Sequence, residues 1–224
     1  MDRDPGRFFF ALLSLARFSV QTGILDRPLV AGFLIYLVTG EMFPAMYVAV
    51  FFELLWIDII PAGTFIPPNA VFCVVATMCL VEIFGLHSPA HIFPAMVLAV
   101  PAAFVCSWLE GVQRTSQNKN YNIILQQSRK NHLRYHPEVM IRTSLSRLFL
   151  IYAAVGVMGI YILTLVFGLA LDHLEFKNFL PWEVLLLVAS VSALAGLRIK
   201  KAYVSLVLGM VCIAGVLTWK IMSG

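Results

Sequence analysis

Hydrophobic residues dominate the chain, but in its first half prolines, glycines and acids interrupt them at short intervals. Between positions 27 and 69 the apolar runs are divided by Glu41 and Glu53. Neither run reaches the ~20 residues that a helix needs to cross a bilayer. Eight of the eleven prolines lie between positions 28 and 101. The pattern predicts broken or re-entrant helices in this half, with a further helix over residues 69–86.

Longer uncharged runs follow. Residues 89–109 are long enough to span a bilayer. We expect Pro94 and Pro101 to kink this helix, because proline removes a backbone donor and clashes with the preceding turn. The second half contains three further apolar segments, at 148–171, 184–197 and 202–219. Their regular pattern predicts ordinary transmembrane helices.

Composition identifies the class of protein. The chain is 60% hydrophobic and only 12% charged, whereas a soluble domain carries about 25% charged residues. So few charges cannot cover a surface in water, so we expect an all-α polytopic membrane protein. The net charge of +4 does not indicate nucleic-acid binding, because the basic residues gather in membrane-side segments.

One polar segment, residues 113–147, separates the two halves. It carries seven Lys and Arg residues against a single acid, Glu138. The positive-inside rule places such a segment in the cytoplasm. The expected organisation is therefore a substrate-handling half at 1–112, a basic cytoplasmic loop at 113–147 and a scaffold half at 148–224.

The cysteines and histidines give little support for a metal or redox site. All four cysteines lie in apolar runs without Cys-x-x-Cys spacing, as buried small hydrophobic residues do. Two His-x-x-x-His pairs, His87/His91 and His132/His136, have spacing that places two ligands on one helical face. Pro89 interrupts the first pair and no third ligand is evident. We expect neither metal nor cofactor.

Four groups of residues in the broken region form a recognisable pattern: Arg27-Pro28-Leu29, Gly40-Glu41, Glu53 and Pro68-Asn69. At this spacing they resemble the IIC subunit of the mannose-type (mannose–fructose–sorbose) bacterial phosphotransferase system. The resemblance implies a sugar permease of the bacterial inner membrane. It also implies an oligomer with a second membrane subunit, IID, and cytoplasmic partners IIA and IIB. Sugar would cross at the membrane subunits and be phosphorylated by IIB.

Several positions depart from the family's pattern. Phe51 and Phe52 precede the glutamate where the family tends to have small residues, and Pro61 stands where it has an asparagine. Asn69 occupies a position that is often aspartate. Asp58 lies three residues before Pro61, which is one face of a helix if the segment is helical. We hypothesise that Asp58 supplies the polar group lost at position 61.

The expected sugar-binding residues are polar or aromatic side chains of this region: Glu53, Asn69, Asp58, Glu41 and Trp56. Carboxylates and amides can clamp neighbouring sugar hydroxyls by hydrogen bonds. Simpler roles remain open for several of them. Glu41 could cap a helix, Trp56 could anchor the chain at the membrane interface, and Glu53 could be an acid at a membrane boundary. Arg27 could form a local ion pair with Asp26.

The basic segment also suggests a docking role. Arg129, Lys130 and Arg134 could receive IIB, because arginines favour phosphate and acidic surfaces. Membrane topology alone would explain the same charges.

Three other functions remain open at this level. An ion-coupled secondary transporter could use Glu53 or Asp58 as a proton site. A IIC-like subunit could be retained for sensing or assembly, as Phe51, Phe52 and Pro61 suggest. A membrane-embedded enzyme is supported only by the histidine pairs and scattered acids. The sequence shows no nucleophile–base pair or phosphate-binding glycine loop, so we expect the chain to perform no bond chemistry itself.

Overall fold

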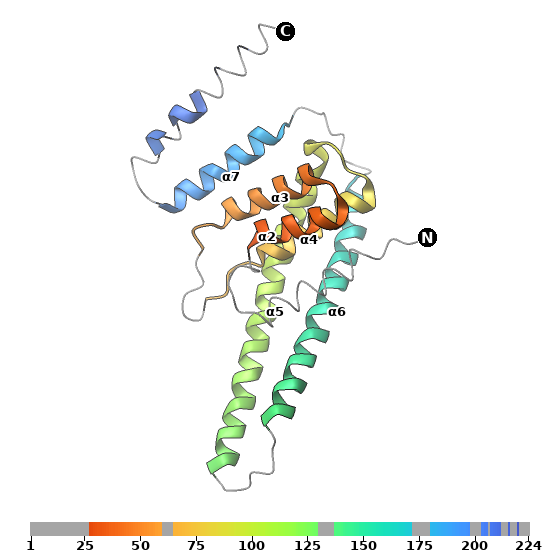
Figure 1. Ribbon diagram of the computed structural model, residues 1–224, viewed down its shortest axis with the longest axis vertical. Coiled ribbons are helices and arrows are strands. Elements are labelled where there is room, and N and C mark those ends of the chain that lie inside the picture. The colour runs from red at the N-terminus through yellow and green to blue at the C-terminus, as the bar shows by residue number, and fades with distance from the viewer. Residues whose placement is uncertain are drawn as a thin grey trace.

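The computed structural model describes residues 27–59, 65–129, 137–171 and 180–197, and, near the C-terminus, 203–205, 207–211, 215 and 219. In this part of the chain the regular structure is entirely helical, so the expected all-α fold is confirmed there. The main helices are α2 (Pro28–Thr39), α3 (Met42–Leu55), α4 (Ala70–Phe84), α5 (Pro89–Arg129), α6 (Pro137–Leu171) and α7 (Trp182–Leu197) (Figure 1).

The first three of these helices are short, as predicted. They contain 12, 14 and 15 residues, fewer than the ~20 that a crossing requires. Gly40 ends α2 in the left-handed region at φ 76°, and its N–H donates to the carbonyl of Tyr36. Glycine adopts this conformation without steric cost. The chain then leaves helical geometry again after Leu55 and re-enters it at Ala70.

Helix α5 contains the long apolar helix predicted at residues 89–109 and continues beyond it to Arg129. It contains Pro94 and Pro101 but runs as one helix of 41 residues, so the first half is not broken throughout. Each proline removes a single helical hydrogen bond, and the turns on both sides continue the helix. Within it, Pro89–Ser116 is long and apolar enough to cross a membrane, as is Ala153–Leu171 of α6. Only 33% and 22% of their apolar windows are buried, so most of this surface faces outward.

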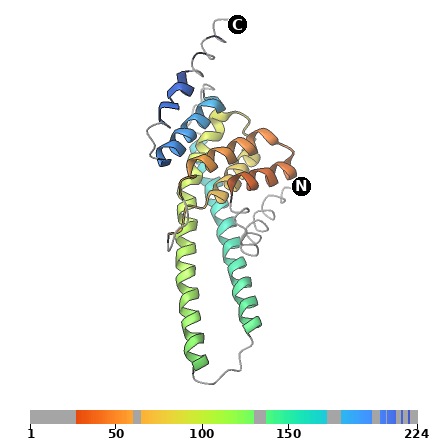
Figure 2. The ribbon, with the colours of Figure 1, turned by 60° about the vertical axis from the view of Figure 1, so that its left-hand side comes forward.

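The basic segment 113–147 is not a loop where the structure describes it. Residues 113–129 continue α5, and residues 137–147 begin α6. Residues 113–129 contain no glycine or proline, and Pro137 stands at the first position of α6, so nothing interrupts a helix in the two described parts of this segment. The two helices project together well beyond the others (Figure 2). The predicted polar connection is therefore largely a helical hairpin.

Helix α5 packs closely on α4 and on the segment before it. Along one face of α5 every fourth residue is small: Ala95, Ala99, Ala103, Ser107 and Gly111. The three alanines are fully buried, and small side chains let helix backbones approach one another in a membrane. The Sγ of Cys73 in α4 lies 3.3 Å from the carbonyl oxygen of Ala99. The two helices run antiparallel, because Asn69 meets Ala103 while Cys73 meets Ala99.

Glycines also determine how α6 packs against α4. A Cβ at Gly159 would lie 3.2 Å from the ring of Phe72. Further along, Phe84 meets Phe167 edge to face, with ring centroids 5.2 Å apart. Phe72 thus occupies a position on α6 where a side chain is absent, whereas Phe84 packs ring against ring.

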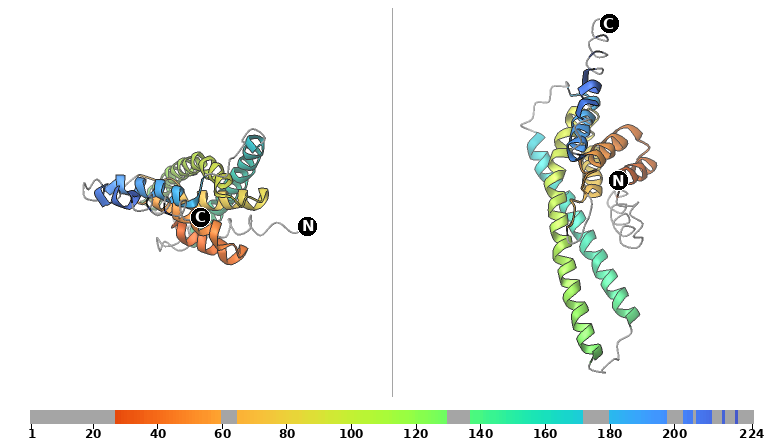
Figure 3. Two further views of the ribbon diagram at one scale, coloured as in Figure 1. Left: turned by 90° about the horizontal axis from the view of Figure 1, so that it is seen from above. Right: turned by 90° about the vertical axis from the view of Figure 1, so that its left-hand side faces the viewer.

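Helix α7 runs alongside α3. Tyr47 stacks on Trp182 with ring centroids 5.0 Å apart, and the Ser192 hydroxyl lies 3.4 Å from the carbonyl oxygen of Leu55. The 16 described residues of α7 are shorter than a full crossing. Of the crossing predicted for residues 202–219, the structure describes 203–205, 207–211, 215 and 219, all of them helical. Seen from above, α6 and α7 lie at opposite edges of the molecule (Figure 3).

Helices α2 and α3 form a tight antiparallel hairpin around Gly32. A Cβ added at Gly32 would lie 2.4 Å from the Cβ of Ala49 and 2.9 Å from the carbonyl oxygen of Ala45. Both alanines are fully buried. The hairpin therefore depends on the absence of a side chain at position 32.

Substitution of Gly32→Val should separate the hairpin. We expect a loss of about 1–3 kcal/mol in the free energy of unfolding, the usual effect of overpacking. Thermal unfolding of the detergent-solubilised protein measures it. Gly209→Ala is the control, because a Cβ at Gly209 meets no heavy atom within 4 Å. Equal unfolding temperatures for the two variants would contradict the close packing.

Candidate functional site

The candidate site lies between α3 and α4, where the described residues 56–59 and 65–69 are not helical. Helix α3 ends at Leu55, and residues 56–58 form a turn in which the N–H of Ile59 donates to the carbonyl of Trp56 at 3.1 Å. Residues 65–69 have no regular secondary structure, and α4 begins directly after them. Most of the residues predicted to bind sugar border this break.

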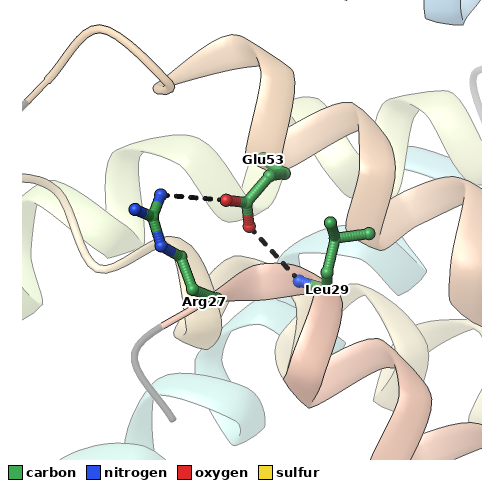
Figure 4. A network of polar contacts seen from close by, with 3 residues as sticks. All are labelled: Arg27, Leu29 and Glu53. Atoms are coloured by element: carbon green, nitrogen blue, oxygen red, sulfur yellow. Dashed lines mark hydrogen bonds and ion pairs between the residues drawn. The ribbon is translucent and has the colours of Figure 1, made fainter. Parts of the chain in front are cut away.

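Glu53, in the last turn of α3, is held by the N-terminus of α2 (Figure 4). Its Oε1 lies 3.0 Å from Nη1 of Arg27, and the backbone N–H of Leu29 donates to Oε2 at 3.4 Å. The Glu53 side chain is only 12% exposed, whereas that of Arg27 is 60% exposed. A carboxylate at a helix N-terminus is also stabilised by the helix dipole. Glu53 therefore links the two ends of the α2–α3 hairpin.

The pairing of Arg27 differs from the local pair suggested by the sequence. Arg27 binds Glu53, 26 positions away, whereas Asp26 lies outside the described residues. The Glu53 side chain is only 12% exposed, which argues against an acid simply exposed at the membrane boundary.

Asn69 caps helix α4. Its Oδ1 accepts a hydrogen bond from the N–H of Phe72 at 3.0 Å, which satisfies one of the unpaired donors at the helix start. This cap uses only the oxygen of the side chain. The Nδ2 group of an asparagine remains a donor for a ligand hydroxyl.

The break lies at the middle of the α5 span. The N–H of Asn69 donates to the carbonyl of Ala103 at 3.4 Å. The span Pro89–Ser116 has 28 residues, which is about 42 Å of helix, so Ala103 lies about 20 Å from either end. In a bilayer centred on this span, whose hydrocarbon core is ~30 Å thick, the break would lie near mid-depth.

In the non-helical segment 65–69, several backbone positions need no further hydrogen-bond acceptor. Pro67 and Pro68 have no N–H, and that of Asn69 is bound to Ala103. The carbonyl of Pro67 accepts from the hydroxyl of Ser107, with an oxygen–oxygen distance of 2.8 Å. Non-helical backbone is tolerated at membrane depth only where protein or a wet cavity satisfies it. Sequence reasoning missed Ser107, although its place among small residues spaced by four was a detectable signal.

Asp58 packs against α7, and Trp56 packs on a ring of α3. An added Cβ at Gly196 of α7 would lie 2.4 Å from the Cβ of Asp58, so Asp58 lies directly against α7. Trp56 stacks on Phe52 with ring centroids 5.6 Å apart, and its ring is thus partly covered. Asp58 belongs to a turn rather than a helix, so the argument that it shares a helical face with Pro61 is wrong; Pro61 itself lies outside the described residues.

The two phenylalanines that depart from the family's pattern fill the protein interior. Phe51 is 6% exposed and Phe52 is fully buried. Their rings meet edge to face, with centroids 5.5 Å apart. Their side chains therefore belong to the hydrophobic core and do not line an open surface.

Glu41 is not part of the same cluster. It is exposed and occupies the N-cap position of α3, but its side chain makes no capping hydrogen bond. It lies at the opposite end of α3 from Glu53, about 18 Å away along the helix axis. Of the predicted docking residues, Arg129 is the last residue of α5, and Lys130 and Arg134 lie outside the described residues.

Comparison with known proteins gives one family and one fold. The family model described as "PTS system sorbose-specific IIC component" matches residues 8–176. A solved structure described as "Structure of membrane protein" is similar in fold, with a TM-score of 0.58 and 18% sequence identity over 97% of this chain and 91% of that chain. No curated protein matches the chain.

The cap at Asn69 can be separated from its amide donor. Asn69→Ala should lower the free energy of unfolding by about 1 kcal/mol, because the N–H of Phe72 loses its acceptor. Asn69→Asp retains an acceptor oxygen and should unfold at the unchanged temperature. Thermal unfolding in detergent compares the two, and equal destabilisation by both would contradict the capping role.

Proposed function

Because the chain belongs to the family of PTS system sorbose-specific IIC components, we propose that it binds a hexose at the α3–α4 break and presents it to IIB for phosphorylation. The family match covers well over half of the chain. The protein is thus a IIC permease component of a mannose-type phosphotransferase system, a family of the bacterial inner membrane.

The observation that carries the proposal is the non-helical backbone at the middle of the α5 span, held there by the Asn69–Ala103 hydrogen bond. In transporters, discontinuous helices near the bilayer midplane form substrate sites. Acids within a membrane protein usually face its interior or a water-filled path, and Glu53, beside this break, is 12% exposed.

The roles of the side chains follow from their chemistry. Glu53 is proposed to accept hydrogen bonds from sugar hydroxyls, and its contacts with Arg27 and Leu29 hold the carboxylate in place. Asn69 is proposed to donate from Nδ2 at the N-terminus of α4. Asp58 and Trp56 border the same break and are proposed to act at its α7 side. Glu41 is too far along α3 to contact the same sugar molecule.

Transport then needs the partners of the family. We propose assembly with IID in the membrane, with IIA and IIB acting from the cytoplasm. The basic tip of the α5–α6 hairpin, which includes Arg129, is the proposed docking surface for IIB. The hairpin projects beyond the remaining helices (Figure 2), which makes its tip accessible to a cytoplasmic protein.

Glu53→Gln tests the sugar site. The amide keeps the size of the side chain but removes its charge, and hydrogen bonds to a charged group contribute about 1.5–3 kcal/mol. We expect the hexose to bind roughly 10- to 100-fold more weakly, which raises the KM for uptake by a similar factor. The measurement is phosphoenolpyruvate-dependent uptake of sorbose, fructose and mannose in cells that also express IIA, IIB and IID.

Two controls accompany this variant. Arg27→Gln breaks the same ion pair but keeps the carboxylate, so its effect should be clearly smaller. Glu82→Gln changes an exposed acid of α4 and should leave uptake unchanged. If Glu53→Gln transports normally, or if uptake collapses with an uncoupler while phosphoenolpyruvate is plentiful, the proposal fails.

The docking surface has its own test. Replacing Arg129, Lys130 and Arg134 by glutamine should reduce sugar phosphorylation by IIB about tenfold, because the charges that attract IIB are lost. Binding of the hexose to isolated membranes should persist. Raising the salt concentration should have less effect on the triple variant than on the unchanged protein. Normal phosphorylation in the triple variant would exclude this surface.

A further inference from the structure

Glu110 is an acid buried within the α5 span that the sequence pattern did not single out. Among the described residues it is the only buried Asp, Glu, Lys or Arg, and its side chain is 8% exposed. Nη2 of Arg114, one turn further along α5, lies 2.6 Å from Oε1 of Glu110. The Arg114 side chain is 56% exposed, so the pair connects the interior to the polar end of the helix.

The pair lies on the face of α5 that holds the break. Ser107, one turn before Glu110, contacts Pro67. At Gly111, the next residue, a Cβ would lie 3.5 Å from Cδ1 of Ile66. Glu110 is therefore beside the non-helical segment 65–69. It lies about 10 Å along α5 from Ala103, in the direction of the basic hairpin. This depth is still within the hydrocarbon core, whose half-thickness is about 15 Å.

A structural role alone gives a weak account of this position. Ion pairs at i,i+4 stabilise a helix slightly when both groups are exposed. Burying the carboxylate adds a desolvation penalty that a hydrophobic residue would avoid. Ionisable residues at membrane depth instead mark substrate pathways.

We propose that Glu110, oriented by Arg114, forms a second sugar-binding position between the α3–α4 break and the basic end of the molecule. This inference depends on the proposed function. The carboxylate accepts hydrogen bonds from hydroxyls and the guanidinium donates them, so the pair suits a neutral polyhydroxylated ligand. A sugar leaving the break toward IIB passes this position, and the pair binds it on that route.

The position predicts separate effects on binding and on release. Glu110→Gln should leave equilibrium binding of the hexose within about twofold, because the first site is intact. It should lower the rate of phosphorylation by IIB about tenfold, the effect of losing a hydrogen bond to a charged group. Glu110→Asp keeps the carboxylate and should recover part of the rate. The assay uses membranes containing the chain with IID, IIA and IIB, and the hexose that the unchanged chain takes up.

Each alternative outcome overturns the inference. A normal rate in Glu110→Gln makes the pair dispensable. Equally slow Glu110→Gln and Glu110→Asp, with lowered unfolding temperatures, make it structural. Loss of equilibrium binding in Glu110→Gln makes Glu110 part of the first site. Glu82→Gln is the control for a change of charge. Failure of the proposed function would be distinguishable, because the unchanged chain would then take up no hexose or Glu53→Gln would behave normally.

Discussion

The structure depends on how the polar backbone of the α3–α4 break is satisfied within apolar surroundings. In the break, Pro67 and Pro68 remove two N–H groups that would otherwise need acceptors. The remaining contacts go to α5, where Ala103 accepts from the N–H of Asn69 and Ser107 donates to Pro67. These contacts are possible only because the facing residues of α5 are small. The same face brings α4 close enough for Cys73 to meet Ala99.

Local rules predicted the short helices but not the way they pair. Proline, glycine and acid positions correctly indicated helices shorter than a crossing, and Gly40 ends α2 as such positions often do. The apolar run at 89–109 correctly indicated a helix long enough to cross a membrane, and that helix continues through Pro94 and Pro101; the kink expected at these prolines stays a prediction. The high polarity of residues 113–147 predicted a loop. Residues 113–129, however, contain no glycine or proline that would interrupt a helix, and they continue α5.

The sequence predicted residues that border the candidate site but not the contacts that they make, because those contacts join residues far apart in the chain. Glu53 and Asn69 border one break, as expected, because each ends or begins a helix that flanks it. The partner of Glu53 could not be read from the chain, since Arg27 reaches it only after α2 and α3 fold back on each other. Asp58 meets a glycine of α7 more than one hundred positions later. Such contacts depend on the assembled helices, and no periodicity in the sequence encodes them.

One helix connects the contact with the α3–α4 break, at Ala103, to the basic end of α5, at Arg129. Between Ala103 and Arg129, α5 is continuous and about 39 Å long. Pro101 lies two residues before Ala103 and lacks a helical hydrogen bond, so it is the position next to this stretch where a helix bends most readily. A displacement of the basic end of α5 would therefore reach the residues that contact the break along one continuous helix, with no intervening loop.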